Sequence, residues 1–378
     1  MGAELLLYGY GLVCLSMLGF NLIYALLLRG GDRRMERRVS GMDRLVNAQL
    51  QRLQTGRPVE KFHLSRMDRT LSRVRGLLAF DQYLDQIPPE DPAFQQYLSQ
   101  MRPVFLHLAA VYRRRESTQP AYFCHVLTKL PLPSGLSTDP LPQIILSYME
   151  RDDLYCRVNA LKALCSFGGA EPIVQALQLL SREPPAPLHS KVIVETLLCY
   201  KGCMAELIQM LWDTFPRYST QVQRAILDFI RFQGGNCGPE MLKILADGSR
   251  SKELRFAAIR YFGRYSYAPA LPLLLEFVRD LDPLRWEYAA ISASALARYS
   301  GQEVVDALML AMHSPNWYVR FNAAGSLEAH GLSYADLLEV IGGSDRYARE
   351  MLLYRLEIRR QRESLPESAA DAAEEVTL

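Results

Sequence analysis

The stretch CRVNALKALCSFGG, from Cys156 to Gly169, decides the fold, because its pattern returns five more times along the chain. In the regular copies a cation stands near the start of a helix, small or aliphatic residues follow three, four and seven places later, and glycine comes next. Two such copies are LRFAAIRYFGRY (254–265) and VRFNAAGSLEAHG (319–331). A second apolar helix follows each copy, so the sequence predicts a series of helical hairpins.

The repeat has a period close to 32 residues. With the cation position as anchor, the six copies start at Arg157, Lys191, Gln223, Arg255, Trp286 and Arg320. Successive anchors lie 34, 32, 32, 31 and 34 residues apart. Three positions after each anchor stands an apolar and mostly small residue: Ala160, Val194, Ile226, Ala258, Ala289 and Ala323. Small residues there let neighbouring helices approach closely, so we expect an all-α chain of stacked hairpins.

The spacing Asp-x-x-x-Arg-x-x-Ala-Leu, carried by Asp153, Arg157, Ala160 and Leu161, resembles the short bacterial HEAT-like repeat of phycobilisome-linked lyases. The resemblance covers roughly residues 120–360. It implies a right-handed α-solenoid whose Arg-bearing helices line the concave face. Some HEAT-like proteins attach bilins and others are DNA glycosylases that remove alkylated bases, so an enzyme or ligand-binding solenoid is the alternative by fold analogy.

The chain is expected to fall into five segments. These are a transmembrane anchor (1–30), a basic amphipathic juxtamembrane helix and linker (31–58), a helical N-terminal cap with degenerate repeats (59–152), the HEAT-like repeats with a capping helix (153–362) and a disordered acidic tail (363–378).

The expected anchor contains 24 residues without a charge, residues 5–28. As a helix this run is roughly 36 Å long, against about 30 Å for a hydrocarbon core. A cleaved signal peptide would need cations before the run and small residues at its end, and Glu4 and Leu28 stand there instead. The cations that follow predict an N-terminus outside the inner membrane and a solenoid in the cytosol, and we expect them at an anionic lipid surface: Arg29, Arg33, Arg34, Arg37 and Arg38.

Two features near the N-terminus could contact a partner helix. Asn21 is a lone amide in the apolar run, and it either hydrogen-bonds a second helix or lies near the headgroups and bonds within its own helix. An apolar stripe at helical spacing runs from Met35 to Leu53 and could lie on lipid or pair two copies of the chain. A homo-oligomer therefore stays open.

Composition and motifs give little support to catalysis. A net charge of +2 over 378 residues does not favour a nucleic-acid binder, and 49% hydrophobic with 22% charged residues excludes a largely disordered chain. Seven cysteines without framework spacing predict reduced thiols, and six histidines show no zinc spacing, so we expect no metal and no cofactor. GGNCG (234–238) lacks the Lys-Ser/Thr of a phosphate loop.

The remaining signal is the surface of the Arg-bearing helices. Aromatic and arginine side chains are enriched at protein interfaces, although each aromatic could instead fill a gap between repeats. The candidate strip consists of Arg224, Asp228, Phe232, Arg260, Tyr261, Arg264, Tyr288 and Phe321. We therefore expect a non-catalytic membrane-anchored scaffold that binds a protein of a membrane complex, either an integral membrane enzyme or a transporter subunit. The family resemblance suggests a polysaccharide synthase glycosyltransferase as one such partner.

Overall fold

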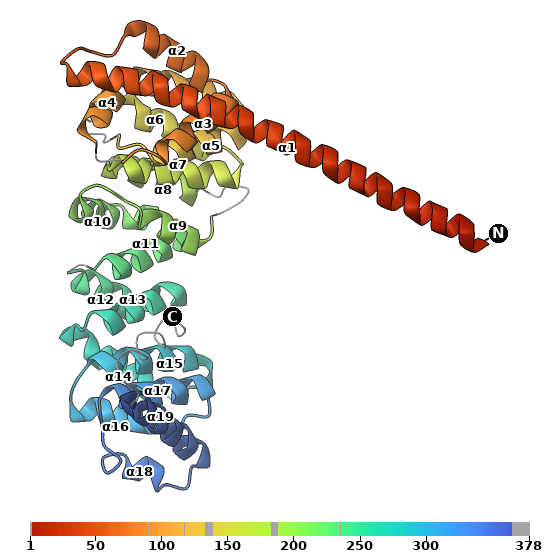
Figure 1. Ribbon diagram of the computed structural model, residues 1–378. Helices are drawn as coiled ribbons and strands as arrows, with labels where there is room; N and C mark the ends of the chain where they lie inside the picture. The colour runs from red at the N-terminus through yellow and green to blue at the C-terminus, as the bar shows by residue number, and fades with distance from the viewer. Residues whose placement is uncertain are drawn as a thin grey trace. The chain divides into compact units, whose positions relative to one another are not determined.

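The computed structural model describes residues 2–364, except 89–90, 117, 133–138, 183–187, 235 and 281. Inside the terminal helices, side chains are not described for residues 2–7, 23, 25–31 and 362–364. All regular secondary structure in the described residues is helical (Figure 1). The predicted all-α class is confirmed, and the expected acidic tail lies outside the described residues except for its first two positions.

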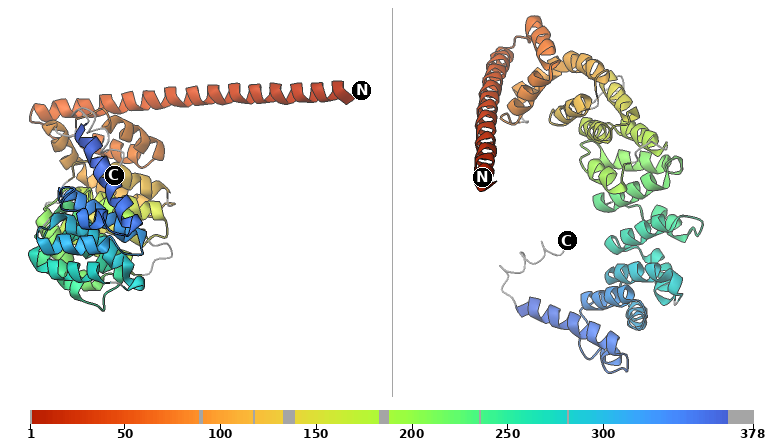
Figure 2. Two further views of the ribbon diagram at one scale, coloured as in Figure 1. Left: turned by 90° about the horizontal axis from the view of Figure 1, so that it is seen from below. Right: turned by 90° about the vertical axis from the view of Figure 1, so that its right-hand side faces the viewer.

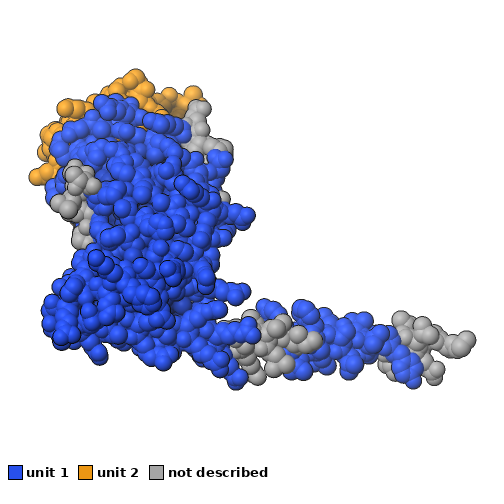
Figure 3. Space-filling view, turned by 90° about the horizontal axis from the view of Figure 1, so that it is seen from above, with its two compact units in different colours: residues 1–188, 199–217 blue, residues 189–198, 218–378 orange. Residues whose placement is uncertain are grey.

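The chain divides into two compact units, coloured separately in Figure 3. Unit 1 comprises residues 1–188 and 199–217. Its α-helices are α1 (Gly2–Gln54), α2 (Lys61–Leu71), α3 (Val74–Leu84), α4 (Pro92–Arg113), α5 (Thr118–Thr128), α6 (Pro140–Leu146), α7 (Leu154–Phe167), α8 (Ala170–Ser181) and α10 (Met204–Asp213).

Unit 2 comprises residues 189–198 and 218–378. Its α-helices are α9 (Ser190–Leu197), α11 (Thr220–Gln233), α12 (Gly238–Ala246), α13 (Lys252–Arg264), α14 (Leu271–Arg279), α15 (Trp286–Ala295), α16 (Gln302–Ala311), α17 (Trp317–Ala329), α18 (Leu338–Ile341) and α19 (Arg346–Ser364). Short 3₁₀ turns connect several helices: Ser147–Glu150, Phe215–Arg217, Ala268–Ala270, Pro283–Arg285 and Leu296–Arg298.

Helix α1 is one continuous rod that extends beyond the other helices of unit 1 (Figure 2, left). The expected anchor segment (1–30) and the expected juxtamembrane helix both lie on this one helix, which ends at Gln54. The apolar stripe is buried from Val39 to Leu53, because this half of α1 packs on α3 and α4. The stripe is therefore used within the chain, whereas the sequence left lipid or a second copy as its partner.

The prediction of a membrane-spanning helix over residues 1–30 is wrong. Among the residues that the structure describes, no helix combines the length and the apolar character that a bilayer crossing needs. The inner-membrane location, the outward N-terminus and the cytosolic solenoid were derived from that span and are corrected with it.

The acid of the repeat motif begins the first helix of a hairpin. Asp153 is the N-cap of α7, where its carboxylate accepts a hydrogen bond from the backbone N–H of Cys156 at 3.0 Å. Asn316 caps α17 in the same way through Tyr318 N–H at 2.9 Å. An amide oxygen accepts this bond as well as a carboxylate does, which explains why Asn replaces Asp in the last copy.

Two of the anchor cations, Arg255 and Arg320, bind backbone carbonyls at or just beyond the end of the preceding second helix. In α13, Arg255 Nε donates to the carbonyl of Leu245 at 2.9 Å. In α17, Arg320 Nη1 donates to the carbonyl of Ser314 at 2.9 Å. Arg349 of α19 is not one of the six anchors, but its Nη1 makes the same kind of contact to the carbonyl of Gly343 at 3.3 Å. The carbonyls at a helix C-terminus lack intrahelical partners, so each cation closes one hairpin onto the next helix.

Polar side chains join successive repeats at the period found in the sequence. Tyr200 donates to Gly168 within unit 1, and Tyr265 donates to Arg231 within unit 2. Between α15 and α17, Asn322 and Ser326 donate to carbonyls 32 and 33 residues earlier. The six positions predicted to pack between helices are all buried, so that prediction is confirmed: Ala160, Val194, Ile226, Ala258, Ala289 and Ala323.

The last predicted hairpin is shorter than expected. Its second helix, α18, has four residues where the sequence predicts helix over 335–343. Before it, the Ser333 hydroxyl donates to the Asp336 carboxylate at 2.7 Å in a local turn, and Gly342 and Gly343 follow it. Both features favour turns over helix. Helix α19 follows and packs on α17 and α18.

Candidate protein-binding surface

Charged residues of the predicted strip form one network on α11 and α13 in unit 2. Arg224 Nη1 lies 2.9 Å from Glu253 Oε2 on the next first helix, and its Nε lies 3.9 Å from Asp228. Arg231 Nη2 lies 3.3 Å from the same Asp228 carboxylate. Sequence reasoning missed Arg231 and Glu253, although the three-residue spacing from Asp228 to Arg231 could have revealed the first.

Phe232 is the exposed aromatic residue of this network, with 43% of its surface accessible. The guanidinium of Arg231 lies 4.5 Å from the ring centroid and that of Arg264 lies 5.9 Å away. A partly exposed apolar ring therefore lies beside two cations. Such a combination suits a partner surface that carries both a carboxylate and an apolar group.

Arg260 lies half-buried on α13. Burial lowers the pKa of its guanidinium, the carboxylate of Asp228 opposes that effect, and the neighbouring cations Arg224 and Arg231 add to it. Arg260 is therefore close enough to feel the charges of this network, and part of its side chain reaches the surface.

Tyr261 does not belong to the exposed strip, which corrects the prediction. It is 2% exposed, and its hydroxyl accepts a hydrogen bond from the backbone N–H of Cys237 at 3.1 Å. Burial raises the pKa of the Tyr261 phenol. Successive helical residues point about 100° apart, so Tyr261 faces the interior while Arg260 faces outward.

Tyr288 fills a gap between helices, as the alternative interpretation of the aromatics predicts. Its ring packs edge-on against Phe256 at 4.7 Å and tilted against Phe277 at 5.1 Å. The Arg255 guanidinium lies 5.0 Å from the Tyr288 ring centroid. Tyr288 is consequently half-buried and contributes packing more than open surface.

Phe321 belongs to a second aromatic group, at the start of α17. Its ring stacks on Trp317 at 4.7 Å, and the Arg355 guanidinium lies 4.2 Å from its centroid. Trp317 also meets Tyr318 edge-on, and Tyr318 stacks on Trp286 of α15 at 5.6 Å. Trp317 and Tyr318 are 49% and 57% exposed.

Sequence reasoning missed Trp286, Trp317 and Tyr318 as surface residues. The signal was available, because Trp317 and Tyr318 stand three and two positions before the Arg320 anchor, in the first turn of a repeat helix. Side chains in the first turn extend past the helix end and remain partly accessible. This aromatic cluster is defined as Trp286, Trp317, Tyr318 and Phe321.

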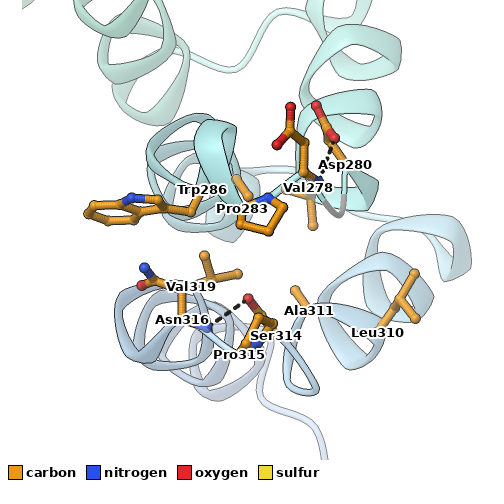
Figure 4. A pocket seen from close by; sticks show the side chains of 12 residues that line it. Val278, Asp280, Pro283, Trp286, Leu310, Ala311, Ser314, Pro315, Asn316 and Val319 are labelled. Atoms are coloured by element: carbon orange, nitrogen blue, oxygen red, sulfur yellow. Dashed lines mark hydrogen bonds between the residues drawn. The ribbon is translucent and has the colours of Figure 1, made fainter.

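A cleft of about 240 Å³ opens beside the aromatic cluster (Figure 4). Pro283 and Trp286 lie on one side of it, and Val319 and Asn316 lie on the other. Ala311 and Leu310 of α16 border it, and Leu310 is 48% exposed. The lining is mixed, because Asp280, Asp282, Ser314 and Asn316 add polar groups to these apolar side chains. The cleft is smaller than the usual space for a cofactor.

The shifted pKa values do not converge on a catalytic group. Burial raises the pKa of the Cys124 and Cys165 thiols, which keeps them protonated, and local hydrogen bonds lower the pKa of the exposed carboxyl groups of Asp247 and Asp336. In the described part of the chain, no three His, Cys, Asp or Glu side chains are placed to hold a metal ion.

The N-terminal residues singled out in the sequence all lie on α1. Asn21 is exposed. The side chain of Arg29 lies outside the described residues. The other four cations expected at a lipid surface are exposed on the same helix: Arg33, Arg34, Arg37 and Arg38.

Comparison with known proteins gives no family for the chain. No protein-family model matches it, and no curated protein does.

Proposed function

We propose that the chain is a non-catalytic scaffold built as a right-handed α-solenoid of HEAT-like hairpins, which binds a protein partner through unit 2. Support for the repeat comes from the side-chain bonds across 32 to 34 residues and from the anchor cations that bind helix-end carbonyls. The binding surface consists of two parts: the charge network with Phe232 on α11 and α13, and the aromatic cluster with its cleft.

The exposed aromatic cluster is the observation that carries this proposal. Trp317 and Tyr318 are large side chains left half in water on well-packed helices, and a cleft sized for one apolar side chain adjoins them. Burying such rings at an interface excludes much apolar area at little entropic cost, because each ring has two rotatable bonds. A protein partner is the kind of ligand that provides the matching area.

The test is co-purification from the source organism with a tagged full-length chain. Replacing both residues, Trp317→Ala and Tyr318→Ala, is expected to remove the partner, since truncating an aromatic hot spot costs about 2 kcal/mol, roughly thirtyfold in affinity. The matched control is Tyr155→Ala on α7, whose side chain is 74% exposed in unit 1. Equal recovery with the double variant, or equal loss with the control, contradicts the proposal.

A further inference from the structure

A groove of about 1110 Å³ lies on unit 1, bordered by α1, α2 and the start of α3. It is separate from the surface described above, which belongs to unit 2. Six arginine side chains line it, two from α1, two from α2 and two from the α2–α3 turn and the start of α3: Arg38, Arg44, Arg66, Arg69, Arg73 and Arg75.

These six arginines are exposed, and none of them forms an ion pair among the described residues. Residues 38–79 contain three acids, and each contacts a residue that does not line the groove. Glu60 pairs with Arg52 at 3.0 Å, Asp68 contacts His107 at 2.7 Å, and Asp43 accepts from Asn47 at 2.8 Å. None of the three lines the groove, which therefore concentrates positive charge on its own lining.

The walls of the groove are held in place before any ligand arrives. The end of α2 is fixed because the buried Tyr112 hydroxyl donates to the Leu71 carbonyl at 2.8 Å. Gly76, at the start of α3, is buried so close to Thr70 that a Cβ would overlap with the Thr70 carbonyl. On the other wall, Met42 of α1 is 3% exposed and anchors that helix to the core. Such preorganisation reduces the entropic cost of binding.

The groove also offers apolar surface between its cations. Phe62 on α2 is 74% exposed, and Leu45 and Val74 are half-buried at its border. A ligand that fits it must carry both negative charge and apolar groups. Guanidinium forks bind carboxylates through two parallel hydrogen bonds, and Phe62 provides a contact for an aliphatic side chain.

We propose that this groove is a binding site for an acidic peptide segment of a partner protein, one in which glutamate or aspartate alternates with apolar residues. The apolar border favours such a peptide over a nucleic acid, because a phosphate backbone has no apolar groups to pack on Leu45 and Val74. The whole chain has a net charge of only +2, so it does not exert the long-range attraction for nucleic acid that is typical of nucleic-acid binders.

The experiment measures fluorescence polarisation of a labelled peptide in which pairs of glutamates alternate with leucine, titrated with the full-length chain. Arg66→Glu with Arg69→Glu is expected to weaken binding about tenfold or more, because two attractive contacts become repulsive. The control is Arg114→Glu with Arg217→Glu, an equal charge change at two exposed arginines of unit 1 outside the groove, and it should stay within about twofold. A peptide with glutamine for glutamate should not bind.

Thermal unfolding followed by circular dichroism checks that each variant is folded. If the charge reversal impairs folding, Arg66→Gln with Arg69→Gln and, separately, Phe62→Ser test the two parts of the groove with milder changes, and each should weaken binding. No binding to the native chain, equal binding by groove and control variants, or tighter binding of a single-stranded oligouridylate than of the peptide would each overturn the proposal.

Discussion

Arginines gather in two regions of this chain, and the two groups behave differently. On α11 and α13 of unit 2, Arg224 and Arg231 are paired with Glu253 and Asp228. In the groove of unit 1, none of the six arginines has a carboxylate partner among the described residues. The same residue type thus forms ion pairs within the chain in one region and has no carboxylate partner among the described residues in the other. The number of carboxylate partners of each arginine distinguishes the two groups, and only the structure gives that number.

The largest expected effect concerns the shape of the groove. Gly76→Ala should lower the free energy of unfolding by about 1–3 kcal/mol, because its Cβ overlaps with the Thr70 carbonyl and the backbone has to shift. Gly41→Ala, on the facing wall, has open space around the new methyl group and should change stability by no more than about 1 kcal/mol, towards greater stability. Urea denaturation measures both. Equal effects of the two substitutions would mean that the α2–α3 turn is not tightly fitted.

The second prediction concerns acidification of unit 1. His63 on α2 is buried beside Tyr97, and burial lowers its pKa below the ordinary value of 6.5. Its neutral form is therefore favoured in the folded chain, so its contribution to stability is present above pH 6.5 and is lost as the pH falls below that value.

Urea denaturation of the native chain at pH 7.5 and 5.5 should show this loss. His63→Gln keeps a polar group near Tyr97 but cannot titrate, so the variant should lose less stability between the two pH values. An identical pH dependence in the native chain and the variant would contradict the assignment.

The third prediction tests an anchor cation of unit 2. Arg320→Met should lower the free energy of unfolding by about 1 kcal/mol, because the Ser314 carbonyl loses its 2.9 Å hydrogen bond while the aliphatic part of the side chain is kept. Arg298→Met, an exposed arginine of the same unit, is the matched control and should be nearly neutral. A control that costs as much as Arg320→Met would show that the carbonyl contact is unimportant.

The smallest expected effect compares the two arginine groups directly. Arg224→Ala should destabilise the chain by up to about 1 kcal/mol through loss of its ion pairs, whereas Arg69→Ala in the groove should stay within about 0.5 kcal/mol. Thermal unfolding at low ionic strength maximises the difference. If Arg69→Ala proves the more destabilising, the groove arginines are structural and the comparison fails.

Much of the fold could be predicted from the sequence, because the repeat signals are local. The motif of Asp153, Arg157, Ala160 and Leu161 spans little more than two helical turns, and the structure has the helix α7 there. The end of the last hairpin could not be predicted, because the apolar pattern favours a longer α18 and Gly342 and Gly343 oppose it. The packing of the α1 stripe could not be predicted either, because its partners α3 and α4 come later in the chain.

The candidate site was predicted less well. Arg224, Asp228, Phe232, Arg260 and Arg264 do lie together, because they share one helix face in neighbouring repeats. Tyr261 is the exception, because it is one position from the outward-facing Arg260 and its side chain is buried. The groove was not predictable, because its arginines come from three helices whose packing depends on contacts distant in sequence.

The central claim, that unit 2 binds a protein, is tested most directly by photo-crosslinking in the source organism. Benzoylphenylalanine is placed at Trp317, at Phe232 or, as the control, at Tyr155, and the adducts are identified by mass spectrometry. The account predicts one common protein adduct from Trp317 and Phe232 that is absent from Tyr155. Adducts of the same protein at Tyr155, or different proteins at the two unit 2 positions, would contradict it.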